Sequence, residues 1–205
     1  MNLKSKILTK KNIFYLLRYL ILALIIILII ELLKYILNVK DPESNKLKDA
    51  FLSNFFFSFV GTVLIAPILE EVVFRLSLKK NNYYWFSVFL SLIFVLSSKF
   101  ILTQVICSLF IGSLILYQFN VKIYLTRFIL IVLSVLAFVF AHFDNYNENE
   151  LKILGNLDFV MLFIPQFILA LILTKIRLQT GFLNSVIFHS LYNFFILSLA
   201  LLFNF

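Results

Sequence analysis

The 205-residue chain is 62% hydrophobic and only 14% charged, with a formal net charge of +8. Soluble domains are about 45–50% apolar and about 25% charged, so a soluble core is excluded and lipid must solvate most of this chain. Four Gly and three Pro residues are too few for the turns of a membrane barrel, and the apolar residues come in long runs. The single cysteine, Cys107, excludes a disulfide framework and a cysteine-based metal cluster.

Seven apolar stretches approach the roughly 20 residues that a spanning helix needs. They are 13–37, 50–69, 83–97, 101–119, 128–143, 159–174 and 182–205. The third is short and closely linked to the fourth, so these two are either full spans or a shallow hairpin. We expect an all-α polytopic bundle of about seven spanning helices in one integral membrane domain, 1–205. Residues 1–49 would form the first helix and an outer loop, and residues 50–205 the core.

The positive charge has a topological explanation. If the N-terminus is inside, twelve of the 18 Lys and Arg residues flank the inner ends of the helices. This bias predicts a cytoplasmic N-terminus. No basic cluster alternates with aromatic residues on a soluble segment, so we expect no nucleic-acid partner. The Lys-, Asn-, Ile- and Phe-rich composition favours a bacterial plasma membrane.

Two adjacent acids interrupt the second apolar stretch. Glu70 and Glu71 are followed by Arg75, which lies one helical turn after Glu71 and offers it an ion pair. A bilayer disfavours such residues by about 2.5–3.5 kcal/mol each at its centre, so they indicate a functional site. Pro67 removes a helical hydrogen bond just before them and leaves a carbonyl without its partner.

Both histidines of the chain also lie in apolar helices. His142 ends the fifth stretch, and His189 is followed one turn later by Asn193 on the same helical face. A carboxylate can activate water, and imidazole N–H and amide donors suit an oxyanion hole, where one donor contributes about 10²–10³ in rate. Two His and one Glu are equally the ligands of a catalytic zinc site, here Glu70, His142 and His189. The residues alone leave both chemistries open.

Two further expectations concern depth and packing. Apolar boundaries place Glu70 near the inner face and His142 near the outer face, so function requires the Glu70 helix to continue to about Lys79 and the His142 helix to about Asn145. The polar residues Thr62 and Gln166 are interpreted as helix-packing positions.

Three ordered motifs resemble those of the CAAX prenyl protease and bacteriocin-processing family, also called Abi-type membrane proteases. Glu70-Glu71 with Arg75 matches EExxxR, Phe138 with His142 matches FxxxH, and His189 with Asn193 matches HxxxN. The resemblance covers about residues 62–195. Between the first two motifs the chain is longer than in many members, and an extra helix pair is expected there.

The resemblance implies an intramembrane endopeptidase. Glu70 would be the catalytic carboxylate and would activate water together with His142, while Glu71 and Arg75 would orient and balance it. His189 and Asn193 would form the oxyanion site. The implied type is a metal-free glutamate protease with no cofactor, and a zinc protease is the alternative.

The implied substrate is a membrane-anchored or lipidated peptide in the bilayer. A non-enzymatic bacteriocin-immunity or scaffold protein is the second hypothesis, and a transporter or proton relay is the third.

Overall fold

The computed structural model describes residues 9–40, 51, 53–79, 82–146 and 148–202. Most of the predicted outer loop, 41–49, lies outside these residues. Within them, six helices are long and apolar enough to cross a membrane, and α5 is a shorter apolar helix. The predicted all-α polytopic bundle is therefore confirmed. The elements are α1 (Lys10–Ile36), α3 (Phe55–Val60), η1 (Gly61–Ile65), α4 (Ala66–Phe74), η2 (Leu76–Leu78), α5 (Tyr84–Ser97), α6 (Ile101–Gln118), α7 (Ile123–Ala141), η3 (His142–Asn145), α8 (Glu148–Ile153), α9 (Asn156–Thr180) and α10 (Phe182–Leu202).

The helix that carries the acid pair contains a π-helical turn. The segments α3, η1 and α4 follow one another without a break, and η1 is the π turn, in which the N–H of Ala66 donates to the carbonyl of Gly61. The next N–H in this pattern would belong to Pro67, which has none, so the carbonyl of Thr62 loses its backbone partner. The sequence predicts the effect of Pro67 but not the π turn, a feature that is frequent at functional sites.

The helix pair α5–α6 inserts between the first two motifs. The two helices pack against each other, and α6 also packs on α7, while α5 packs on α4. At 14 residues, α5 is about 21 Å long, which is shorter than the roughly 30 Å hydrocarbon core. The predicted third span is therefore the one that falls short of spanning length.

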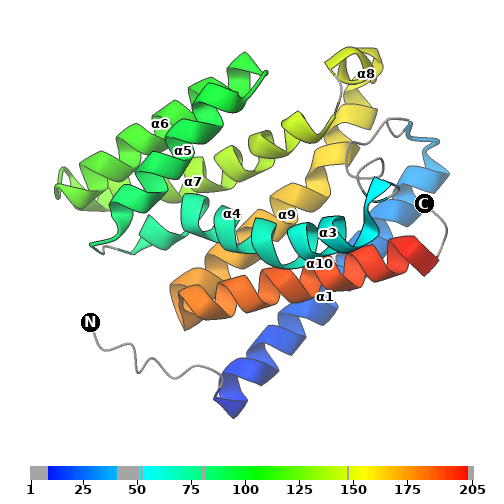
Figure 1. Cartoon of the computed structure of the whole chain (residues 1–205), viewed down its shortest axis with the longest axis horizontal. Coiled ribbons are helices and arrows are strands. Elements are labelled where there is room, and N and C mark those ends of the chain that lie inside the picture. The colour runs from blue at the N-terminus through cyan, green and yellow to red at the C-terminus, as the bar shows by residue number, and fades with distance from the viewer. Residues whose placement is uncertain (1–8, 41–50, 52, 80–81, 147, 203–205) are drawn as a thin grey trace.

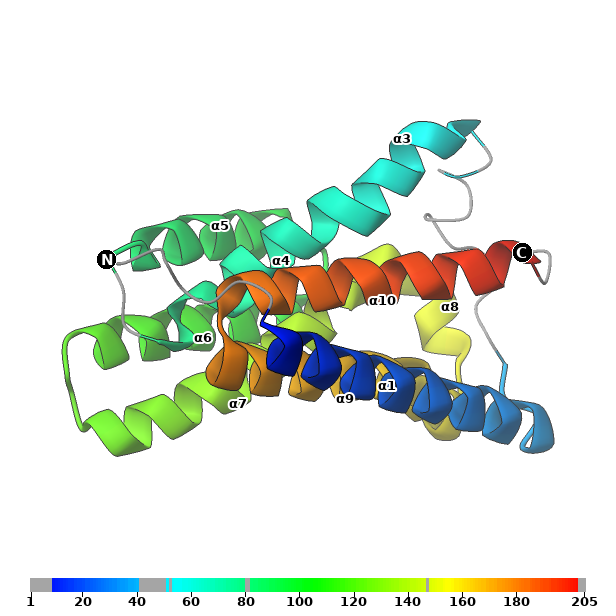
Figure 2. The same ribbon diagram turned by 90° about the horizontal axis from the view of Figure 1, so that it is seen from below.

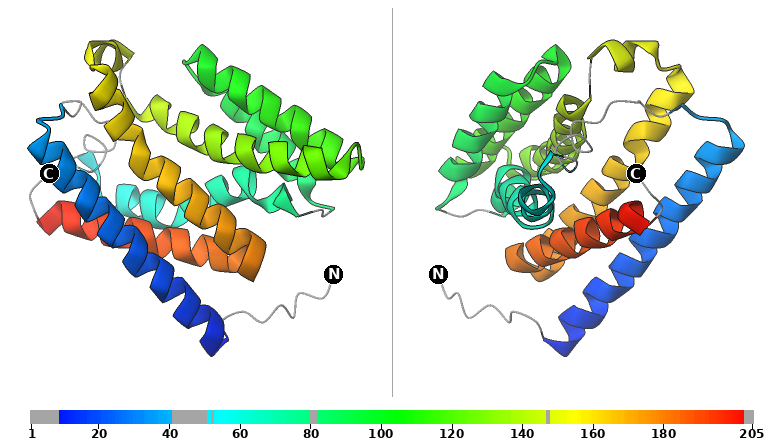
Figure 3. Two further views of the ribbon diagram at one scale, coloured as in Figure 1. Left: turned by 180° about the vertical axis from the view of Figure 1, so that it is seen from behind. Right: turned by 45° about the vertical axis from the view of Figure 1, so that its right-hand side comes forward.

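The remaining helices enclose the acid-bearing helix. In Figures 1 and 2, α10 lies alongside α4, and it also contacts η1, whereas α3 diverges from it in Figure 2. Helix α9 packs on α7 and α10, and in Figure 1 it crosses behind α4. Figure 3 shows α1 on the outside of the bundle, where it packs on α9 and α10. Its buried residues are Leu16, Leu20, Ala23 and Ile30, a single stripe at helical spacing, and its other faces are apolar and exposed as lipid-facing surfaces are.

The ends of the helices fall into two groups. One side of the bundle in Figure 1 contains the start of α1, the end of α4, the α6–α7 link and the end of α9. The other side contains the α5–α6 link, α8 and the end of α10. On the first side, burial lowers the pKa of Lys79, and the nearby charges of Arg177 and Arg127 lower it further. This proximity brings together basic residues that the predicted topology assigns to one face. That this face is cytoplasmic stays a prediction.

Candidate active site

The Glu71 carboxylate is the centre of a buried polar cluster. Its Oε1 lies 2.8 Å from Nη1 of Arg75, and both side chains are fully buried. Its Oε2 accepts a hydrogen bond of 2.5 Å from the hydroxyl of Ser185 on α10. The carboxylate therefore accepts hydrogen bonds from two helices, which compensates for its removal from water.

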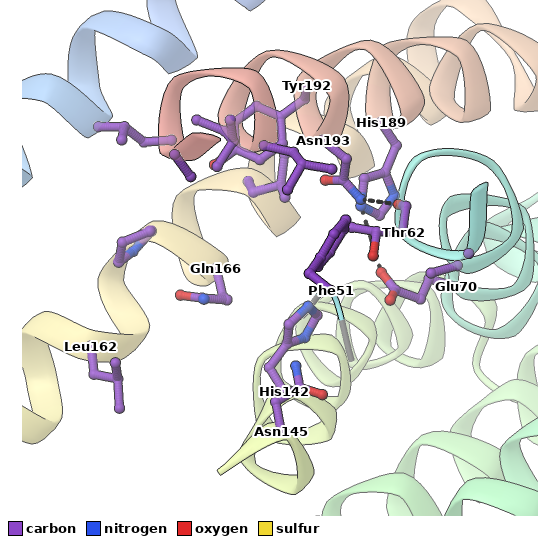
Figure 4. A pocket seen from close by; sticks show the side chains of 18 of the residues that line it. Phe51, Thr62, Glu70, His142, Asn145, Leu162, Gln166, His189, Tyr192 and Asn193 are labelled. Carbon is purple, nitrogen blue, oxygen red and sulfur yellow. Dashed lines mark hydrogen bonds and ion pairs between the residues drawn. The ribbon is translucent and has the colours of Figure 1, made fainter. Parts of the chain in front are cut away.

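His189 connects the two glutamates. Its Nδ1 lies 3.2 Å from Oε1 of Glu71, and its Nε2 lies 3.5 Å from Oε2 of Glu70. Because a carboxylate that pairs with arginine is ionised and only accepts, Nδ1 is the protonated, donating nitrogen. The imidazole is thus oriented by Glu71 and presents Nε2 to Glu70, as Figure 4 shows.

Three side chains from other helices hold the end of α4. The hydroxyl of Ser87 donates to the Val72 carbonyl at 2.6 Å, and the hydroxyl of Ser134 donates to the Phe74 carbonyl at 2.6 Å. Arg177 donates to the carbonyls of Arg75 and Leu76 at 2.9 and 2.7 Å. These carbonyls belong to the last turn of α4 and to the start of η2, where intrahelical donors run out and a cation is favourable. The acid pair is therefore held on a fixed helix end.

Phe138, the aromatic residue of the FxxxH motif, contacts the buried arginine and both histidines. Its fully buried ring lies 4.3 Å from the guanidinium carbon of Arg75, a cation–π contact. The same ring contacts the rings of His142 and His189, with centroid separations of 4.6 and 5.8 Å. Atoms Nε and Nη2 of Arg75 have no hydrogen-bond partner among the described residues. The aromatic face is thus part of what stabilises this buried cation.

His142 lies where α7 tightens into the 3₁₀ turn η3. Its backbone N–H bonds to the carbonyl of Val139, three residues back, so the Phe138 carbonyl loses its usual partner. The ring replaces it, with Nδ1 2.8 Å from the Phe138 oxygen. Since a carbonyl only accepts, Nδ1 carries the proton and Nε2 of the neutral ring is a free acceptor.

Asn193 satisfies the carbonyl that Pro67 leaves without a partner. Its Nδ2 donates to the oxygen of Thr62 at 2.9 Å, across 131 residues of sequence. An amide nitrogen carries two hydrogens, so one N–H remains for the cavity that Asn193 lines.

One cavity of about 580 Å³ joins these groups. Glu70, His142, His189 and Asn193 lie on its wall, and Figure 4 shows them converging from α4, η3 and α10. The side chain of Glu70 is 20% exposed, whereas that of Glu71 is 0% exposed. Apolar side chains from α1, α9 and α10, among them Ile27, Leu162 and Ile196, line the rest. The volume and mixed lining suit an apolar ligand with a few polar anchor points.

The structure thus brings all six predicted site residues together. Glu70 and His142 line one cavity, and their helices continue about as far as predicted, to Leu78 through η2 and to Asn145 through η3. Glu71 and Arg75 do not line the cavity, and Glu71 contacts both Arg75 and His189. Sequence reasoning missed Ser185 as a partner of Glu71, and it interpreted Thr62 and Gln166 as packing positions although both line the cavity.

The zinc alternative has its three ligand types at this cavity. Among the described residues, however, no group of three or more His, Cys, Asp or Glu side chains is arranged to hold a metal ion. Nδ1 of His142 contacts the Phe138 carbonyl and Nδ1 of His189 contacts Glu71. A metal-binding histidine has the same kind of Nδ1 contact and binds through Nε2, so the glutamate type and the zinc type both stay predictions.

Comparison with known proteins gives the family. No curated protein and no solved structure matches this chain. Residues 52–195 match the model of the family described as type II CAAX prenyl endopeptidase Rce1-like. The match extends over more than half of the chain and includes every residue of the three motifs. This integral membrane protein therefore belongs to the Rce1-like type II CAAX prenyl endopeptidase family.

Proposed function

We propose that the protein hydrolyses a peptide bond of a membrane-anchored or lipidated peptide, with a water molecule activated by Glu70 and His142. The observation that carries this proposal is the presence of both side chains on one cavity inside the helix bundle. Family membership supports the reaction class, that of an intramembrane CAAX-type protease. We further propose a bacterial plasma membrane as its location, with the N-terminus cytoplasmic.

The first step uses two acceptors. A water that donates one hydrogen to the Glu70 carboxylate and the other to Nε2 of His142 directs a lone pair at the carbonyl carbon of the substrate. As the C–O bond forms, the proton passes to Glu70, the general base. The tautomer of His142, fixed by the Phe138 carbonyl, supports this role because it leaves Nε2 as the acceptor.

The second step needs donors for the oxyanion. The free N–H of Asn193 is one donor, and Nε2–H of His189 is the other when both nitrogens of that ring carry protons. Glu71 would stabilise the charged ring, as a buried carboxylate does for the imidazole of a catalytic triad. The C–N bond then breaks, and the leaving amine takes the proton held by Glu70.

The test compares new peptide termini in host membranes carrying wild type, Glu70→Ala or His142→Ala at equal expression. The proposal expects termini that appear only with wild type, since losing a general base lowers rates by about 10²–10⁴. A parallel wild-type sample treated with a zinc chelator separates the two protease types, because glutamate-type cleavage persists there. Identical termini in all three proteins would favour the non-enzymatic immunity or scaffold function, and proton flux in liposomes would favour the relay.

A further inference from the structure

Gln166 presents a buried acceptor with no partner. It lies on α9 and lines the cavity, and Figure 4 shows its side chain extending into the space opposite Glu70. Its Oε1 is buried, and no described residue donates a hydrogen bond to it. Buried polar atoms are satisfied in the great majority of cases, so an unpaired one beside a cavity calls for an explanation.

Several other polar groups of this cavity have partners, and among the described residues that line it the one other buried acceptor without a hydrogen bond, Oε2 of Glu70, belongs to the proposed general base. Asn193 donates to Thr62, His142 binds the Phe138 carbonyl, and His189 contacts both glutamates. A residue that served only to pack helices would be expected to use its amide on a neighbouring helix, as Asn193 does. Gln166 lies instead at the wall, with its amide at the edge of the open volume. Its missing partner is therefore to be sought in what fills the cavity.

We propose that Gln166 binds a peptide group of the substrate on the side of the cavity opposite the acid pair. A carboxamide offers one acceptor and two donors, so Oε1 accepts the N–H of a backbone amide while Nε2 donates to a backbone carbonyl. A contact of this kind recognises the peptide backbone and does not depend on the side chains of the substrate. It holds an extended segment across the cavity, with the scissile carbonyl at Glu70. This assignment rests on the proposed function and deepens it.

The experiment uses purified full-length protein in lipid vesicles. The probes are pooled octapeptides with an N-terminal palmitoyl chain and a C-terminal fluorophore. Cleavage is measured for wild type, Gln166→Leu and the control Gln179→Leu, which alters an exposed glutamine on the same helix. Binding is measured separately in the Glu70→Gln background. Gln166→Leu should weaken binding and lower kcat/KM about tenfold across the pool, and the control should change neither.

Single ester-for-amide replacements then identify the contact. They are made along the pool member that the Glu70→Gln protein binds most tightly, and each removes one backbone N–H. At one position the ester should weaken binding to Glu70→Gln about tenfold but have no further effect once Gln166→Leu is added, since both changes remove the same hydrogen bond. If Gln166→Leu instead weakened binding by destabilising the helix bundle, its loss of affinity would add to the loss caused by the ester at every position.

The outcomes separate the two proposals. Unchanged binding and cleavage in Gln166→Leu, or losses additive with every ester, overturn the role of Gln166 and leave the protease intact. Binding that depends on Gln166 without any cleavage by wild type overturns the protease but supports the peptide contact. A wild type that neither binds nor cleaves any member of the pool overturns both.

Discussion

The two neighbouring glutamates have opposite surroundings. Glu71 is fully buried and bonds to Arg75 and Ser185, whereas Glu70 is partly exposed and lines the cavity. One residue turns an α-helix by about 100°, so a single step moves a side chain from the packed face to the cavity face. His189 contacts both acids. Glu71 is therefore held in place by its partners, while Glu70 is accessible from the cavity, which supports the catalytic role proposed for it.

The largest expected effect tests the buried acid. Glu71→Ala should lower the free energy of unfolding by about 3–5 kcal/mol, because it leaves the Arg75 charge buried without its counterion. Glu70→Ala should change stability little. The measurement is thermal unfolding of purified protein in one detergent.

A rescue makes this comparison sharper. Adding Arg75→Met to Glu71→Ala removes the stranded charge, so the double variant should be more stable than Glu71→Ala alone. Equal destabilisation by Glu70→Ala and Glu71→Ala would contradict the division between the two acids.

A smaller effect is expected at Phe138, which stacks on the buried cation. Phe138→Leu should cost about 2 kcal/mol, since it removes a desolvated cation–π contact while keeping an apolar side chain. Phe128→Leu is the matched control, because Phe128 lies on the same helix and is 67% exposed. The same unfolding assay compares the two, and equal losses would show that the contact with Arg75 contributes nothing.

The smallest effect concerns the cavity side. Asn193→Ala should cost about 0.6–1 kcal/mol by leaving the Thr62 carbonyl without its donor. In a Pro67→Ala background the new backbone N–H provides an alternative donor, so the same substitution should cost less. Thermal unfolding of wild type, the two single variants and the double variant gives the coupling energy between Asn193 and Pro67. If Asn193→Ala costs the same stability in both backgrounds, the hydrogen bond of Asn193 does not depend on Pro67.

The sequence predicts the features that depend on residues close together in the chain. Apolar runs gave the helices to within a few residues at most ends, and the i, i+4 spacing gave the Glu71–Arg75 pair that the structure contains. The family resemblance added the order of the motifs, which the family match supports.

Other features depend on contacts that no local pattern encodes. Ser185 is one serine in an apolar helix, and nothing near it in the sequence indicates that it contacts Glu71, which lies 114 residues earlier in the chain. The π turn depends on one shifted hydrogen bond, and Gln166 resembles a packing residue until the cavity wall is known. Burial and cavity shape are properties of the assembled bundle, so the sequence identified the ionisable residues of the candidate site better than their partners.

The partners of the acid pair also imply an order of events during synthesis. Arg75 emerges within a turn of Glu71, but Ser185 and His189 are made 114 and 118 residues later. At about 5–20 residues per second, a ribosome needs roughly 6–25 seconds to cover that distance. During that interval the Thr62 carbonyl also lacks Asn193. The last helix of the bundle therefore completes the site, and a nascent chain that has not yet inserted α10 holds its acids without the imidazole that joins them.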